Sequence, residues 1–337
     1  MAEISIAVRL DSIPGVRPNA ASLRRALTQA RAMGASSVEI CGRGLIDVSE
    51  LSDTGVRTLR KILDDLSLQV ASIRFPTLHG FDRVEDLDRR IDATKQAMRT
   101  AYRLGAPLVV NQIGPVPKPP QSTQSSGSAS GSSPMVVGEM PPEGLSMEQA
   151  AAWASSMARA SGLGASGSVD TGTNGVGPRG GSRSGGTEAV DPRWDTMRSV
   201  LEDLGRFGAR VGAFFAAETG TEPGEYLAKL IDTSAESYIA VALNPGQLII
   251  NRHSVSDAIA ALGDRIRIVN AVDGVVDLSA GRSVAVPVGQ GTADFPSLLG
   301  QLEDIPYRGP FVVGRPEMPA ATAVNELVQS VNYLKNL

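Results

Sequence analysis

The feature that most constrains the fold of this 337-residue chain is a regular alternation of short apolar segments with longer amphipathic ones. The short segments are rich in Val, Ile and Ala and are bounded by turn residues, which is typical of β-strands. The amphipathic segments between them are typical of α-helices that cover one face of a sheet. The sequence contains eight such pairs, whose strands are expected at residues 4–10, 36–42, 69–75, 107–113, 213–219, 238–243, 265–272 and 309–314.

Strands of this composition that alternate with helices indicate a parallel sheet covered by helices. Eight strand and helix pairs predict an α/β fold in which the sheet closes on itself, the (β/α)8 or TIM barrel. A doubly wound open sheet is the competing architecture. That fold carries a glycine-rich phosphate-binding turn after its first strand, and the sequence has none there. We therefore expect the barrel.

The barrel pattern is interrupted after the fourth strand by a long segment of low complexity. Stretches such as "QSTQSSGSASGSS" contain too few apolar residues to offset the entropy of ordering the chain. We expect a mostly disordered insertion at residues 116–187, with one short helix within residues 146–160. The two halves of the barrel are then residues 1–115 and 188–337. Together they are close to the roughly 250 residues typical of this fold.

Composition excludes several classes of function. Lys and Arg total 32 against 36 Asp and Glu, a formal charge of −4, so the chain has no basic excess for binding nucleic acid. One cysteine, Cys41, and two histidines cannot provide a disulfide framework or a Cys/His zinc cluster. The N-terminus lacks the pattern of a signal peptide, and no apolar run approaches the roughly 18 residues of a membrane span. We expect a cytoplasmic protein without a nucleic-acid or membrane partner.

In a barrel of this kind the functional residues lie at the carboxyl ends of the strands. The polar residues expected there are Arg9, Glu39, Arg43, Arg74, Asn111, Gln112, Glu218, Asn244, Asn270, Asp273, Arg315 and Glu317.

Three of these residues allow two interpretations each. Glu218 ends an otherwise apolar strand, where an unpaired charge is costly to bury, and it is favoured as a metal ligand or general base over an ion pair with an arginine. Asn244 precedes Pro-Gly, which favours a turn residue that bonds the local backbone. Asn270 has no neighbouring Gly or Pro, so a site role and a turn role stay open. Asp273 and Gly274 resemble an ordinary turn.

The arginines of this set are either a binding site for an anion or solvated loop residues. Arg9, Arg43, Arg74 and Arg315 could bind phosphate or carboxylate together, because guanidinium groups offer paired donors. His79 and His253 are expected at the surface.

The order of these segments resembles the xylose isomerase-like TIM-barrel superfamily, which includes sugar and sugar-phosphate isomerases and epimerases. The resemblance covers nearly the whole chain outside the insertion. It is carried by "GASSVEI", "RRIDATKQAMRTAYRLGAPLVV", "FFAAETG", "ALNPGQLIINRHSVSDAIAALGDRIRIVNAVDG" and "VPVGQGTADFPSLLGQLEDIPYRGPFVV". A more distant branch of metal-dependent endonucleases needs several histidines, whereas this chain has two.

The resemblance implies one divalent metal, Mn²⁺, Mg²⁺ or Co²⁺, held by Glu, Asp, His and Glu at strands five to eight. Glu218 matches the first of these ligands. Asn244 stands where the Asp is expected, Asn270 where the His is expected, and Gly314 where the second Glu is expected, with Glu317 three residues later. Loss of carboxylates weakens a site for these hard cations. The resemblance therefore implies a degenerate metal site.

Two hypotheses follow for the function. The first is a sugar or sugar-phosphate isomerase or epimerase that transfers a proton at carbon. Glu218 would be its base, Asp273 or Glu317 the second acid or base, and its substrate-binding residues would be Arg9, Arg74, Asn111, Asn244, Asn270 and Arg315. The second hypothesis is a non-catalytic barrel that binds an anionic small ligand or a protein partner.

Overall fold

The computed structural model of the protein describes residues 4–120, 191–277, 282–315 and 318–337. The predicted insertion at 116–187 lies outside these ranges except for residues 116–120, and so does the helix predicted within 146–160. Glu317 also lies outside the described residues.

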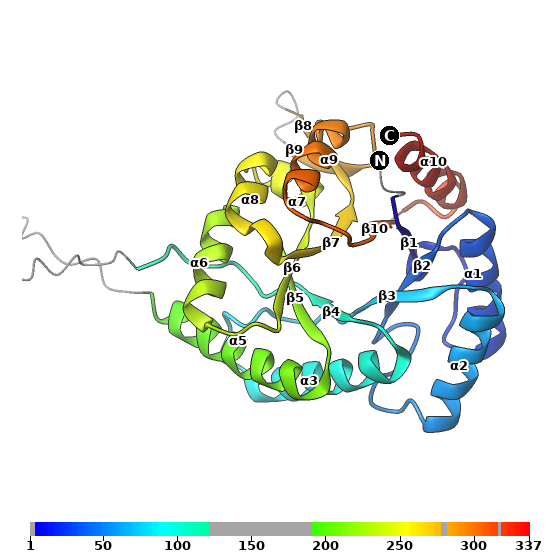
Figure 1. The fold of residues 1–337 in the computed structure, drawn as a ribbon, viewed down its shortest axis with the longest axis horizontal. Coiled ribbons are helices and arrows are strands. Elements are labelled where there is room, and N and C mark those ends of the chain that lie inside the picture. Colours follow the sequence, from blue (N-terminus) through cyan, green and yellow to red (C-terminus); the bar gives the residue numbers. More distant parts are fainter. Residues whose placement is uncertain (1–3, 121–190, 278–281, 316–317) are drawn as a thin grey trace, which may run out of the picture. The chain divides into compact units, whose positions relative to one another are not determined.

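Eight parallel strands of the described residues form a closed barrel, as the sequence predicts (Figure 1). The barrel closes where β1 pairs with β10, with Ile6 opposite Phe311 and Val8 opposite Val313. The order around the barrel is β1, β10, β7, β6, β5, β4, β3, β2. The strands are β1 (Ile6–Arg9), β2 (Ser37–Cys41), β3 (Gln69–Arg74), β4 (Leu108–Asn111), β5 (Phe214–Glu218), β6 (Ile239–Leu243), β7 (Ile266–Ala271) and β10 (Phe311–Val313).

Helices surround the barrel, and their ends follow from local sequence (Figure 1). Asn19 and Ser52 begin two of them, because each side chain accepts a hydrogen bond from a backbone N–H in the first turn. Gly105 and Gly212 end two others in the left-handed conformation, at φ 75° and 84°. The helices are α1 (Ala20–Ala32), α2 (Asp53–Asp65), α3 (Leu87–Leu104), α5 (Pro192–Val211), α6 (Gly224–Ser234), α7 (Pro245–Ile250), α8 (Val255–Leu262), α9 (Phe295–Asp304), α10 (Ala323–Lys335) and the 3-10 helices η1 (Leu10–Ser12) and η2 (Gly263–Arg265). No helix in the described part of the chain is long and apolar enough to cross a membrane.

The inside of the barrel holds a separate apolar cluster made only of strand residues. The large core between strands and helices is distinct from it. More than half of the inner cluster is alanine, and each of its members is at most 6% exposed. Such buried interiors are close-packed in proteins. The inner cluster consists of Ala7, Ala71, Leu108, Val110, Ala216, Ala240, Ala242, Ile268 and Val312.

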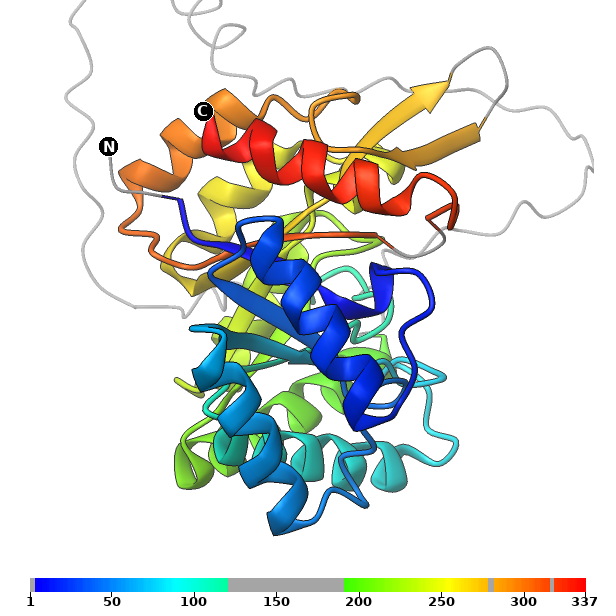
Figure 2. The same ribbon diagram turned by 90° about the vertical axis from the view of Figure 1, so that its right-hand side faces the viewer.

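One local prediction from the sequence is wrong. Asp273 and Gly274 do not form a turn but begin β8 (Asp273–Asp277), which pairs antiparallel with β9 (Arg282–Val286). This hairpin lies on the same side of the barrel as η1, the element that follows β1 (Figure 2). That side, where the strands have their carboxyl ends, is called the mouth.

The buried, alanine-rich interior predicts that a larger side chain within it destabilises the fold. Ala216→Leu should lower the free energy of unfolding by about 1–3 kcal/mol, because added methyl groups force their neighbours off favourable rotamers. Urea denaturation measures the change. Ala21→Leu, on the exposed face of α1, is the control and should change stability by less than about 0.5 kcal/mol. Equal stability of the two variants would contradict a closely packed interior.

Candidate functional site

The polar residues of the mouth follow from strand periodicity. Side chains alternate between the faces of a strand, so a residue two positions after an interior residue also points inward. Five strands carry an interior apolar residue followed at this spacing by a polar one; on β4 it is Val110, followed by the exposed Gln112, and the other four pairs form the mouth. These pairs are Ala7 and Arg9, Ala216 and Glu218, Ala242 and Asn244, and Ile268 and Asn270. The spacing therefore brings a carboxylate, two amides and a guanidinium to one end of the barrel.

Two amides hold the carboxylate of Glu218 in place. Its Oε1 accepts hydrogen bonds from Nδ2 of Asn244 at 2.7 Å and from Nδ2 of Asn270 at 2.6 Å. The residue is 9% exposed. Among the described residues Glu218 forms no ion pair with an arginine, and none donates a hydrogen bond to its Oε2. Oε1 is thus held by two donors, and Oε2 has no hydrogen-bond donor among the described residues.

The other contacts of the two amides fix their orientation. Oδ1 of Asn244 accepts a hydrogen bond from the backbone N–H of Gln247 at 3.1 Å and so caps α7. Oδ1 of Asn270 lies 3.4 Å from its donor, Nη2 of Arg9. Because both amide oxygens already have donors, the NH₂ groups are what each side chain presents to Glu218. Asn244 therefore has both the local backbone role and a role at the mouth, and the fully buried Asn270 belongs to the mouth.

Arg9 connects this carboxylate to a second one. Its Nε donates to Oε1 of Glu39 at 2.6 Å, and Oε2 of Glu39 accepts from the hydroxyl of Ser72 at 2.8 Å. Arg9 is 4% exposed and Glu39 is fully buried. Removal of one partner from a buried ion pair lowers the free energy of unfolding by about 3–5 kcal/mol, because the other charge stays buried without a partner. Arg9 and Glu39 therefore depend on each other.

Arg74 and Asp11 extend the same set of contacts. Nη2 of Arg74 donates to Oδ2 of Asp11 at 2.7 Å, and its Nε lies 4.0 Å from Oε1 of Glu39. Burial alone would lower the pKa of Arg74, but the charges of Asp11 and Glu39 outweigh burial and raise that pKa, so the guanidinium stays charged. We call the connected residues the mouth network: Asp11, Arg74, Ser72, Glu39, Arg9, Asn270, Glu218 and Asn244.

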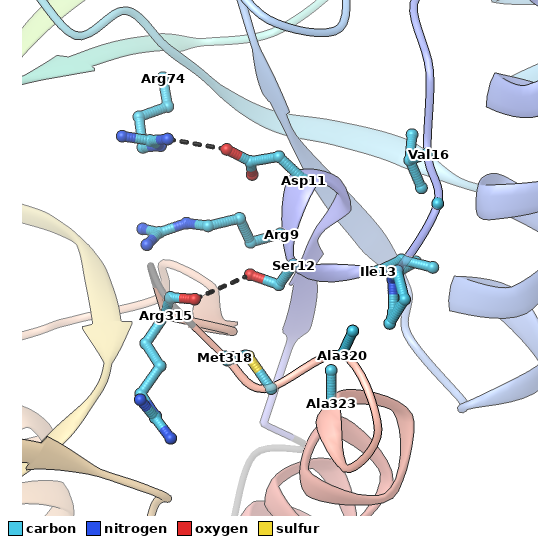
Figure 3. A pocket seen from close by; sticks show the side chains of 12 residues that line it. Arg9, Asp11, Ser12, Ile13, Val16, Arg74, Arg315, Met318, Ala320 and Ala323 are labelled. Carbon is cyan, nitrogen blue, oxygen red and sulfur yellow. Dashed lines mark hydrogen bonds and ion pairs between the residues drawn. The ribbon is translucent and has the colours of Figure 1, made fainter.

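A cleft of about 330 Å³ lies beside the mouth network (Figure 3). The guanidinium groups of Arg9 and Arg74 extend in the same direction, whereas the side chain of Arg315 extends away from them (Figure 3). Glu218 does not line this cleft, so Arg9 is the link between the cleft and the carboxylate. The lining residues are Arg9, Asp11, Ser12, Ile13, Pro14, Gly15, Val16, Arg74, Arg315, Met318, Ala320 and Ala323.

Three predicted binding residues have partners elsewhere. The guanidinium of Arg315 makes two hydrogen bonds to Glu326 on α10, at 2.8 and 3.1 Å. Arg43 stacks over the ring of Phe75, 4.4 Å from its centroid. Asn111 exchanges hydrogen bonds with Thr77. Arg9, Arg74 and Arg315 border the same cleft, whereas Arg43 does not. The charge of Arg315 is paired with Glu326, which lies outside the mouth network.

Asp273 does not join the mouth network either. It is fully buried, and its oxygens accept four backbone hydrogen bonds, of 2.8–3.1 Å. The donors are Gly274, Gly289, Gly291 and Ala293. The carboxylate therefore holds the segment after β9 against the start of β8. Because the carboxylate is fully buried, a substrate in the mouth has no direct access to its oxygens.

Gly314 occupies the strand end at which the resemblance implies a second Glu. Its backbone has φ +113°, a conformation that favours glycine. A Cβ placed there would lie 2.6 Å from Oγ of Ser12 and 3.0 Å from Cβ of Arg9. The space beside this strand end is therefore filled by β1 and η1. Glu317, proposed as a substitute, lies outside the described residues.

The residues present do not fit the divalent metal that the resemblance implies. A hard cation needs oxygen ligands, but both amides direct N–H groups at Glu218 and Gly314 has no side chain. Within the described ranges no three His, Cys, Asp or Glu side chains are grouped so as to hold a metal ion. A cation beside Glu218 would find only its Oε2 as a carboxylate ligand, because Oε1 already accepts from both amides.

Glu222 is a buried acid near the mouth that sequence reasoning missed. It follows β5 and is 5% exposed. Burial raises the pKa of Glu222, and hydrogen bonds from Thr221 and from the backbone offset part of that effect. A Thr-Glu-Pro sequence before a helix resembles an ordinary helix start, so no signal in the sequence marks this carboxyl.

The contacts of Asp273 predict a structural effect for its replacement. Asp273→Asn substitutes an NH₂ group for an oxygen that accepts backbone N–H groups, leaving buried donors unpaired at about 1–3 kcal/mol each. We expect the unfolding free energy to fall by at least about 2 kcal/mol and hydrogen exchange to quicken at residues 289–293. The exposed Asp304→Asn is the control. Unchanged stability and exchange would mean that Asp273 does not hold this segment.

Glu222 predicts a pH dependence of stability. A carboxyl whose folded pKa is raised binds its proton more tightly in the folded state, so its contribution to stability falls as pH rises from the ordinary Glu pKa through the raised one. Glu222→Gln should therefore be more stable than the parent protein at neutral pH, and the difference should vanish at low pH. Thermal melts between about pH 3.5 and 7.5 test this expectation. A variant that is less stable at neutral pH would contradict it.

The comparison with known proteins agrees with the barrel fold. The sequence matches the xylose isomerase-like TIM barrel family over residues 27–133 and 138–337. Similar solved structures include a xylose isomerase domain protein from Planctomyces limnophilus, with 15% identity, TM-score 0.68 and coverage of 99% of this chain and 97% of that one. A xylose isomerase-like TIM barrel protein from Mycobacterium smegmatis in complex with magnesium has 15% identity, TM-score 0.64 and coverages of 99% and 96%. A D-allulose 3-epimerase from Methylomonas sp. in complex with D-allulose has 13% identity, TM-score 0.61 and coverages of 99% and 97%.

No functionally curated protein matches the sequence. Fold and sequence together show that the chain belongs to the xylose isomerase-like TIM barrel family.

Proposed function

We propose that the protein is a sugar isomerase or epimerase that moves a proton at a carbon atom of a small, uncharged sugar or polyol. The observation that carries this proposal is the state of Glu218. Two amides hold one carboxylate oxygen, and the other oxygen has no donor among the described residues. A carboxylate fixed in this way is suited to accept a proton from a carbon next to a carbonyl group.

The similar solved structures support a sugar as the substrate. One is an epimerase in complex with D-allulose, and another is a D-psicose 3-epimerase with D-tagatose from Clostridium cellulolyticum H10. Their low identity to this chain means that they support a class of substrate and not an individual sugar. Free ketohexoses and their aldose isomers are therefore the first compounds to test.

The charges of the mouth network support an uncharged sugar over a sugar phosphate. Its two arginines, Arg9 and Arg74, stand against three carboxylates, those of Asp11, Glu39 and Glu218. Each arginine already has a carboxylate within an ion-pair distance. A phosphate group would add further negative charge to a network in which carboxylates already outnumber arginines. Hydroxyl groups, which both donate and accept, suit such a network better.

A non-catalytic barrel is the second candidate, and one observation favours it. Epimerisation needs an acid on the opposite side of the carbon, but Asp273 is enclosed by backbone donors. An isomerase does not need this second acid, because one base can remove the proton from one carbon and return it to the neighbouring carbon. Proton transfer without epimerisation is therefore the simpler form of the proposal.

Proton exchange with solvent tests the proposal whichever sugar is formed as the product. Ketohexoses and aldohexoses are incubated with the protein in D₂O, and NMR measures loss of the C–H signal next to the carbonyl. We expect exchange with at least one uncharged sugar. Glu218→Gln should lower the rate by about 100-fold or more, since general bases contribute 10²–10⁴-fold.

The matched control is Glu303→Gln, a glutamate on the exposed face of α9, which should leave the rate unchanged. Binding of a sugar without exchange, seen as a higher melting temperature, would favour the non-catalytic barrel. Exchange with sugar phosphates only would contradict the choice of an uncharged substrate. A Glu218→Gln variant with the parent rate would remove Glu218 as the base.

A further inference from the structure

The mouth, in which the resemblance implies a metal ion, contains the buried positive charge of Arg9. Arg9 lies on β1, and Gly314 at the end of the neighbouring β10 leaves room for it. A side chain at position 314 would collide with Cβ of Arg9 at 3.0 Å and with Oγ of Ser12 at 2.6 Å. Position 314 therefore carries no metal-ligating side chain because Arg9 and Ser12 fill the space that such a side chain would need.

The two amides complete this arrangement. Asn270 accepts from Arg9 through Oδ1 and donates to Glu218 through Nδ2, so one amide joins the guanidinium to the carboxylate. An ionised aspartate at this position could accept from Arg9 but could not donate to Glu218. The Asn side chain thus connects a cation to a base without neutralising either of them.

Arg9 also has donors to spare. A guanidinium has five N–H groups, of which one is used by Glu39 and one by Asn270. The remaining three have no acceptor among the described residues, and Arg9 lines the cleft. Its position is firmly set, because Glu39, fully buried and bonded to Ser72, holds Nε. The free donors are therefore both fixed and accessible to a ligand.

We infer that Arg9 is the catalytic cation of this barrel and that the proton transfer needs no divalent metal. The inference rests on the proposed function. Glu218 takes the proton from the carbon next to the carbonyl, and the electron pair of the broken C–H bond forms a carbon–carbon double bond. The carbonyl π electrons move to oxygen, where free N–H groups of Arg9 stabilise the negative charge. Glu218 exchanges this proton with solvent and returns a proton to the former carbonyl carbon. The hydroxyl proton of the first carbon moves to the oxyanion, so that a new carbonyl forms there.

Chelation is the first test. Protein treated with EDTA should exchange the C–H of its sugar in D₂O at the same rate as protein supplied with Mn²⁺, Mg²⁺ or Co²⁺. Mn²⁺ alone should leave the melting temperature unchanged. An exchange rate that requires an added metal would overturn the inference and leave the proposed function intact. So would a rise in melting temperature with Mn²⁺ that Glu218→Gln abolishes.

Replacement of Arg9 is the second test. Arg9→Ala should lower kcat for exchange about 100-fold or more, the usual effect of losing a donor to a developing oxyanion. Added methylguanidine should restore part of the loss. The control is Arg267→Gln, an arginine near the amino end of β7 whose guanidinium lies over the ring of Phe214. It should keep the parent kcat.

Arg9→Lys provides the test if Arg9→Ala does not fold. An ammonium keeps the charge but lacks the planar set of paired donors, so kcat should fall about tenfold or more while KM changes little. A purely structural role predicts the reverse, with lower stability and the parent kcat per folded molecule. That result, or no restoration by methylguanidine in a folded Arg9→Ala variant, would overturn the inference. Absence of exchange in the parent protein would overturn the proposed function and this inference together.

Discussion

The buried ion pair between Arg9 and Glu39 is the interaction on which the mouth of this barrel depends. Arg9 belongs to β1, the strand that closes the barrel against β10. It contacts β2 through Glu39 and β7 through Asn270, so one side chain joins strands on both sides of the closure. Burial of two charges is costly, and the hydrogen bonds of Ser72 and Asn270 offset part of that cost. The pair is therefore stable only with its neighbours in place.

The sequence predicts the fold well because the relevant signals are local. Strand and helix periodicity are visible within single segments, and eight pairs leave few alternatives to a closed barrel. The positions of Glu218 and Asn270 at strand ends follow from the same periodicity. Capping by Asn244 was also predictable, because a Pro-Gly pair after an Asn is a local signal.

The partners of these residues were not predictable, because they come from distant segments. The amide of Asn270 is oriented by Arg9, which lies 261 positions away in the sequence. Asp273 resembled a turn residue or an acid, yet it is enclosed by backbone donors that follow a hairpin the sequence did not indicate. Asp11 and Glu222 carry no distinguishing pattern. Pairing of charges depends on the assembled barrel and not on the segment that carries each charge.

Two amides, one of them bonded to Arg9, hold the carboxylate of Glu218, and we infer that proton transfer there needs no divalent metal. The most direct measurement is a crystal structure of the protein soaked with Mn²⁺ and a ketohexose, with anomalous data collected at the manganese edge. We expect no anomalous peak beside Glu218 and a sugar oxygen within hydrogen-bond distance of Arg9. A manganese ion coordinated by Glu218, with Arg9 displaced from Asn270, would contradict it.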